Sequence, residues 1–123
     1  MSEVPPPGPM LGIADQRRGS SVVVTVEGDI DLCTGPDLDR HLRDVVRTAR
    51  SPHPIIVDLS EVAFLGSCGL SVLLRAHQAA EDNGTPLRIV ARQRAILRPV
   101  QAVGLDTVLR VHPCVEEALA QGG

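Results

Sequence analysis

The sequence predicts an α/β domain built on a mixed sheet of four to five strands, with helices packed mainly on one face. Strand-like segments come first, and helix-like and strand-like segments then alternate, which is typical of α/β domains. Segments 21–27 and 55–57 are almost continuously apolar, which indicates strands inside a sheet that is covered on both faces. Three helix-like segments carry apolar stripes that need one common surface, so we expect several helices on the same side.

The amino-terminal third is predicted to hold a tail and two strands. Residues 1–9 are expected to form a disordered tail, because residues 5–9 consist only of proline and glycine. A weak strand is predicted at 11–15, and a firmer one at 21–27, which is rich in valine and threonine. The polar segment 28–31 is expected to end the second strand.

An amphipathic helix should follow, with Thr34 as its N-cap and Asp37 in the acidic position of a capping box. Its apolar stripe consists of Leu38, Leu42, Val45, Val46 and Ala49. A short strand at 55–57 comes next, and Asp58 and Ser60 are expected to turn the chain outward after it. The remaining predicted elements are a helix at 67–82, a strand at 87–91, a helix at 93–103 interrupted by Pro99, a strand at 107–111 and a helix at 113–120.

The composition argues against several classes of protein. The chain has 123 residues, which suits one domain, and 43% of them are hydrophobic, with one Phe and no Trp or Tyr. The scarcity of aromatic residues and the net charge of −3 argue against nucleic-acid binding. No apolar run approaches the ~20 residues of a membrane helix. The proline-rich start does not resemble a signal peptide, so we expect a cytoplasmic protein with no membrane contact.

The cysteines and histidines follow no metal-binding pattern. They are Cys33, Cys68, Cys114, His41, His53, His77 and His112. Their spacing predicts no metal site, no cofactor and no disulfide framework. The segment Gly66-Ser67-Cys68-Gly69 also lacks the G-x-S-x-G pattern of serine hydrolases, so we expect a protein without enzymatic activity.

Ser67 stands where a loop is predicted to deliver the chain to the start of a helix. The first turn of a helix presents unpaired backbone N–H groups and the positive end of the helix dipole. A phosphate group on such a serine would be stabilised by these same groups. Gly66 and Gly69 on either side are expected to let another protein approach the backbone closely. Ser67 could also serve only as an N-cap.

The segment from Asp58 to Leu70 resembles the signature D-L-S-x-V-x-F-x-D-S-S-G-L of the STAS family, the domain of bacterial anti-sigma factor antagonists. The matching residues are Asp58, Leu59, Ser60, Val62, Phe64, Ser67, Gly69 and Leu70. The segment Gly28-Asp29-Ile30-Asp31 is similar to the family's G-E-L-D. The resemblance implies a STAS domain over residues 10–121.

The resemblance also implies a partner-switching function. An antagonist of this type binds an anti-sigma factor that is a serine kinase, and the sigma factor is thereby freed. The kinase then phosphorylates the serine that corresponds to Ser67, the complex dissociates, and a phosphatase resets the switch. We expect a monomer or weak dimer. The expected partner-binding residues are Asp29, Asp31, Asp58, Ser60, Gly66, Cys68, Gly69 and Leu70.

Two positions depart from the family pattern. Gly66 stands where the family usually has Asp, and Cys68 stands where it usually has a second Ser. They suggest an alternative, a STAS interaction module that is not phosphorylated and responds to the redox state of its thiols, with Cys68 as the redox residue. A small-ligand sensor is a further alternative, although no Gly-rich phosphate loop supports it.

Overall fold

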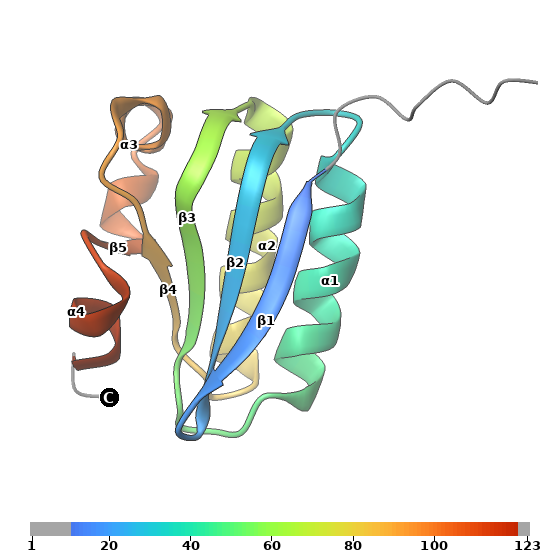
Figure 1. The fold of residues 1–123 in the computed structure, drawn as a ribbon, viewed down its shortest axis with the longest axis vertical. Helices are drawn as coiled ribbons and strands as arrows, with labels where there is room; N and C mark the ends of the chain where they lie inside the picture. The colour runs from blue at the N-terminus through green and yellow to red at the C-terminus, as the bar shows by residue number, and fades with distance from the viewer. Residues whose placement is uncertain (1–10, 121–123) are drawn as a thin grey trace, which may run out of the picture.

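The computed structural model describes residues 11–120, and within them the chain forms a five-stranded mixed sheet (Figure 1). The strands lie in their order along the chain, and they are β1 (Gly12–Arg18), β2 (Ser21–Ile30), β3 (Ile55–Leu65), β4 (Leu87–Val90) and β5 (Arg110–His112). β1 and β2 are an antiparallel hairpin, whereas all later neighbours are parallel. The predicted fold class is therefore confirmed. The tail predicted at residues 1–9 lies outside the described residues.

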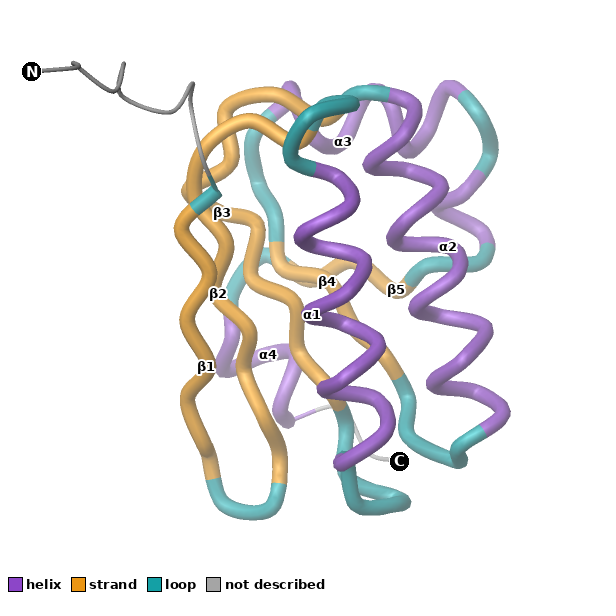
Figure 2. The backbone as a smooth tube through the Cα atoms, turned by 90° about the vertical axis from the view of Figure 1, so that its right-hand side faces the viewer, coloured by secondary structure: helices purple, strands orange, loops and turns teal. Residues whose placement is uncertain are grey.

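The helices cover the two faces of the sheet unequally. They are α1 (Gly35–Thr48), α2 (Ser67–Asp82), α3 (Arg94–Ala102), the short 3-10 helix η1 (Leu105–Thr107) and α4 (Val115–Ala120). Figure 2 shows α1 and α2 side by side on one side of the strands. Within residues 11–120, none of the helices combines the length and the apolar character that crossing a bilayer requires.

Side chains of the central strands point alternately to the two faces of the sheet, one covered by α1 and α2 and the other by α4. Val24 of β2 and Val57 of β3 pair in register, are fully buried and belong to the main core with α1 and α2. Their neighbours Val23 and Ile56 point the opposite way and pack with Ala118 of α4. The valine-rich β2 is thus buried on both faces at this level, as its sequence predicted.

β2 and β3 are longer than the sequence predicted, because polar residues that were expected to end them lie within the sheet. β2 continues through Gly28, whose φ of 113° only glycine adopts easily, to Ile30. β3 continues past Asp58 and Ser60 to Leu65, with register shifts where β3 carries extra residues opposite β2. The expectation that the strands end at these polar residues is therefore wrong.

A glutamine from a later segment allows β3 to continue. β4 pairs with β3 only as far as Asp58, so the next carbonyl groups of β3 lack a strand partner on that side. The Gln93 side-chain amide, just before α3, donates to the carbonyl oxygens of Leu59 and Val62, both at 2.7 Å. These bonds satisfy buried backbone acceptors and fix α3 beside the carboxyl end of β3.

The last predicted strand begins later than expected. Residues 105–107 form the 3-10 helix η1, and the strand starts at Arg110. Gly104, with a φ of 78°, reverses the chain between α3 and η1. Pro99 lies inside α3 without ending it before Ala102.

Candidate functional site

The site predicted around Ser67 lies at the carboxyl ends of the neighbouring strands β2 and β3. Because the two strands are parallel, their last residues Ile30 and Leu65 meet at the same edge of the sheet. The Gly66 N–H donates to the Ile30 carbonyl oxygen at 2.9 Å. The loop that enters α1 and the loop that enters α2 are therefore held side by side (Figure 1).

The loop from Asp31 to Thr34 is fixed by its own hydrogen bonds. The Asp31 carboxylate accepts from the backbone N–H groups of Thr34 and Cys33, at 3.1 and 2.9 Å. These two bonds lower the pKa of Asp31 below its usual value of 3.8. The Thr34 hydroxyl donates to the Asp29 carbonyl oxygen at 2.7 Å and accepts from the Asp31 N–H at 2.9 Å.

The predicted capping box at the start of α1 is therefore not formed. Thr34 does hold the N-cap position, but its hydroxyl makes no capping bond, because it bonds with the preceding loop instead. Asp37 lies 3.4 Å from Arg40 in an exposed ion pair. The loop's internal hydrogen bonds outcompete the local capping pattern.

Ser67 is the first residue of α2, and Gly66 is its N-cap. The Ser67 side chain is exposed, and its hydroxyl takes part in none of the hydrogen bonds found within residues 11–120. The first N–H groups of a helix have no acceptor inside the helix. No acidic residue lies in the first turn of α2, so nothing in that turn would repel an added negative charge.

Exposed apolar side chains surround Ser67. Leu32 is 81% exposed, Phe64 52% and Val103 59%, and we call these three residues together with Ser67 the Ser67 surface. Phe64 lies over Gly66, since a Cβ atom built on Gly66 would be 3.3 Å from the Phe64 ring. A shallow hollow beside Ser67 is lined by Leu70, Ser71, Leu74, Val103 and Leu105. Apolar side chains grouped on a surface are typical of a protein-binding site.

Gly69 was expected at the partner-binding surface, but the structure places it in the interior. It is buried, and a Cβ atom built on it would lie 2.5 Å from Leu65 Cδ1 and 2.6 Å from Ile30 Cγ2. Its missing side chain allows α2 to approach the ends of β2 and β3. This corrects the expectation that Gly69 admits another protein. Leu70 is also mostly buried, at 8% exposure, and lines the hollow beside Ser67.

Cys68 lies on the side of α2 that faces α1. It is half-buried, and its Sγ atom would be 3.4 Å from a Cβ atom built on Gly35. Cys33 is exposed in the loop before α1, and Cys114 lies directly before α4. The geometry therefore gives Cys68 a packing contact between α1 and α2, and Cys68 lines a hollow together with Leu32 of the Ser67 surface.

Asp58 and Ser60 lie within β3, away from Ser67. The Asp58 carboxylate accepts from the Ser60 N–H and hydroxyl, at 3.0 and 2.7 Å. The remainder of β3 separates Asp58 from Leu65 by roughly 20 Å at about 3.3 Å per residue. Asp29, in contrast, pairs with Phe64 at the edge of the Ser67 surface. Of the predicted partner residues, the structure brings Asp29, Asp31, Gly66, Cys68 and Leu70 close to Ser67, buries Gly69 beneath them, and leaves Asp58 and Ser60 apart.

Sequence reasoning identifies Leu70 at this site but not the other apolar residues. Phe64 matches a letter of the family motif without being an expected contact, and Leu32 stands between polar residues of a loop. Val103 directly follows α3 and Leu105 begins η1, both far along the chain from Ser67. An isolated apolar residue in a predicted loop was the one signal available for Leu32.

Comparisons with known proteins agree with this geometry. A model of the STAS domain matches residues 13–118. The anti-sigma-F factor antagonist RsfA of Mycobacterium tuberculosis is 30% identical over 105 residues, covering 85% of this chain and 82% of the relative. RsfB of the same organism, also named an anti-sigma-F factor antagonist, is 34% identical over 97 residues, covering 79% of this chain and 77% of the relative.

A solved structure gives the same result. The crystal structure of an anti-sigma factor antagonist from Mycobacterium paratuberculosis superposes with a TM-score of 0.81 and 32% identity. The match covers 89% of this chain and 91% of that one. The sheet order, the site at the start of α2 and the sequence similarity lead to one conclusion: this chain belongs to the STAS domain family.

Proposed function

We propose that this chain is an anti-sigma factor antagonist. It binds an anti-sigma factor of the serine kinase type through the Ser67 surface, and so frees a sigma factor. Phosphorylation of Ser67 by that kinase ends the complex, and a phosphatase restores it. The chain is a ligand and substrate in this cycle, without enzymatic activity of its own.

The observation that carries the proposal is the exposed Ser67 hydroxyl at the start of α2 among apolar side chains. The apolar group offers area that a partner can cover, and the hydroxyl projects from the same surface. The likeness to proteins named as anti-sigma factor antagonists, at 30% and 34% identity, supports the class of partner.

The proposed transfer moves the γ-phosphoryl group of ATP to Ser67 Oγ. The new bond joins Oγ to phosphorus, the bond from phosphorus to the bridging oxygen breaks, and ADP leaves. We assign the hydroxyl proton to a base on the kinase; the first turn of α2 supplies no carboxylate, and Gly66 stands where the family usually has Asp. The product carries about −1.5 to −2 charges at pH 7.

Charge on Ser67 would oppose binding for a physical reason. A phosphate beside Phe64 and Val103 would have to lose water when an apolar partner surface covered it. The first N–H groups of α2 would meanwhile stabilise the phosphate in the free chain. Both effects favour the dissociated state.

Intact-mass measurement tests the transfer. The chain is incubated with Mg·ATP and each purified anti-sigma kinase of the source organism, together with Ser67→Ala and Ser71→Ala variants. Ser71 is an exposed serine one turn further along α2, which makes it a matched control. We expect one phosphoryl group on the wild type and on Ser71→Ala, and none on Ser67→Ala. Transfer that survives Ser67→Ala, or no transfer from any kinase that binds the chain, would refute the proposal.

A further inference from the structure

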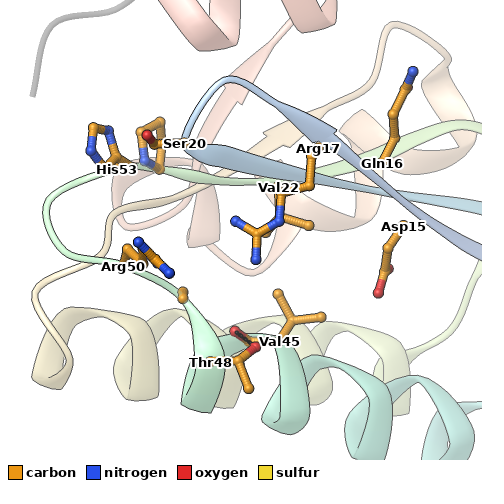
Figure 3. Close-up of a pocket in the computed structure, with 11 residues that line it drawn as sticks. Asp15, Gln16, Arg17, Ser20, Val22, Val45, Thr48, Arg50 and His53 are labelled. Atoms are coloured by element: carbon orange, nitrogen blue, oxygen red, sulfur yellow. Dashed lines mark hydrogen bonds between the residues drawn. The ribbon is translucent and has the colours of Figure 1, made fainter.

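A second candidate site lies at the opposite end of the sheet from Ser67. It is a hollow of about 160 Å³ between the β1–β2 hairpin and the carboxyl end of α1, shown in Figure 3. Arg17, Ser20, Arg50 and His53 lie around it, and Val22 and Val45 form part of its apolar floor. The length of β3 separates it from the Ser67 surface by roughly 30 Å at about 3.3 Å per residue.

Two arginines meet at this hollow without a carboxylate partner. Arg17 extends from β1 toward α1, and Arg50 lies in the loop that follows α1 (Figure 3); both line the hollow. Neither forms an ion pair with the part of the chain that the structure describes. Five other arginines do pair with carboxylates, namely Arg18, Arg40, Arg43, Arg47 and Arg75. Positive charge is thus left unpaired here, on a chain whose net charge is −3.

Asp15 is the acidic residue that lines the hollow, and its carboxylate already has a partner. It lies 2.7 Å from His41 Nε2, a contact that joins β1 to α1. The Thr48 hydroxyl donates to the carbonyl oxygens of its own helix, at 3.1 and 3.3 Å. The guanidinium groups, the His53 ring and the Ser20 hydroxyl therefore remain as donors.

The carboxyl end of α1 lies beside the hollow and is the negative end of its helix dipole, which favours nearby cations such as the two guanidinium groups. The same dipole and the Asp15 carboxylate oppose an anion, so a phosphate group here must be held by both arginines together. The interaction with the dipole does not use up the five N–H donors of each guanidinium group. A guanidinium group binds phosphate through paired N–H···O bonds, and two of them can share one phosphate with its several acceptor oxygens.

We propose that this hollow binds a phosphate group, either free or as the ester of a small organic molecule. Arg17 and Arg50 provide the charge, and Ser20 and His53 provide further hydrogen-bond donors. The floor of Val22 and Val45 accommodates the carbon part of an ester. The hollow shares no lining residue with the Ser67 surface. A failure of this phosphate proposal would therefore leave the proposed partner binding unaffected, and the reverse also holds.

The test measures binding of inorganic phosphate and of phenyl phosphate by two-dimensional NMR of the ¹⁵N-labelled full chain. Ionic strength is held constant with sodium chloride, so that non-specific screening is the same at every point. We expect saturable shifts of backbone amides in residues 17–22 and 48–54 with at least one of the two probes. Saturation by phosphate alone identifies the free ion as sufficient, and tighter binding of phenyl phosphate identifies the ester.

Variants assign the binding to the two arginines. Arg17→Gln combined with Arg50→Gln keeps polar side chains and removes both charges, and we expect at least a tenfold loss of affinity. Arg94→Gln combined with Arg98→Gln, two exposed arginines of α3 outside any described ion pair, should bind as the wild type does. The urea midpoint of each variant checks that it is folded. The absence of saturable shifts with either probe, or equal affinity in the Arg17/Arg50 variant, would overturn the proposal.

Discussion

Ser67 and its two neighbouring glycines show how residues that look alike in sequence differ in role. Gly66 is the N-cap of α2, and the Phe64 ring lies against it. Gly69 is buried where α2 meets the ends of β2 and β3. The sequence motif predicted both glycines beside a helix start, but it could not distinguish the half-buried cap Gly66 from the buried packing contact Gly69. That distinction depends on Ile30, which reaches Gly69 from another strand.

Replacing Gly69 by Ala should destabilise the fold. The new methyl group would lie 2.5 Å from Leu65 Cδ1 and 2.6 Å from Ile30 Cγ2, so α2 must move away from the sheet. We expect the free energy of unfolding in urea to fall by about 1–3 kcal/mol. Gly35→Ala is the matched control, since its methyl group would meet Cys68 Sγ at 3.4 Å, an ordinary contact. Equal stability of Gly69→Ala and the wild type would contradict the packing role.

Among the elements, β3 was predicted correctly where it begins and incorrectly where it ends. Its apolar start, residues 55–57, was predicted as a buried strand, and the structure buries all three residues. Its continuation was missed because Asp58 and Ser60 suggest a turn when they are read locally. The bonds that compensate come from Gln93, more than one element later in the chain. No local pattern reveals such a partner, so strand ends that depend on tertiary hydrogen bonds escape sequence reasoning.

β4, β5 and the helix α4 that packs on them enclose a buried cation. Arg88 of β4 is fully buried, and its Nη1 donates to the Ala118 carbonyl oxygen of α4 at 2.6 Å. His112 of β5 lies nearby. Burial lowers the pKa of His112 below its usual value of 6.5, Arg88 and Arg110 lower it further, and Glu117 partly opposes them. The folded state therefore favours the neutral imidazole.

Acid should weaken the fold through His112. The unfolded chain takes up a proton near pH 6.5, whereas the folded chain resists it until its own lower pKa is reached. Stability from this residue is thus present above about pH 6.5 and lost as the pH falls through the folded pKa. We expect urea unfolding between about pH 7.5 and pH 5 to show a smaller loss of stability in His112→Gln than in the wild type. Identical pH dependences of the wild type and of His112→Gln would disprove this role.

At the scale of the whole molecule, the sheet separates two surfaces. The carboxyl ends of β2 and β3 carry the Ser67 surface, and the hairpin end carries the hollow with Arg17 and Arg50. The α/β class, the order of the elements and the place of Ser67 could be predicted, since each has a local or periodic signal. The apolar group around Ser67 could not, because Val103 approaches it only after the chain has crossed the sheet.

The central claim is that the Ser67 surface binds the partner and that charge on Ser67 abolishes binding. The most direct test compares the affinity of the wild type, Ser67→Asp and Ser60→Asp for the anti-sigma factor. Ser60 is an exposed serine on β3, so its variant adds the same charge away from the site. An aspartate at the first position of α2 is compatible with the helix dipole, so the fold should persist, as the urea midpoint can verify.

We expect Ser67→Asp to weaken binding about 100-fold, which is roughly 2.7 kcal/mol, and Ser60→Asp to bind nearly as the wild type does. Undiminished binding by a folded Ser67→Asp, or an equal loss in both variants, would contradict the account.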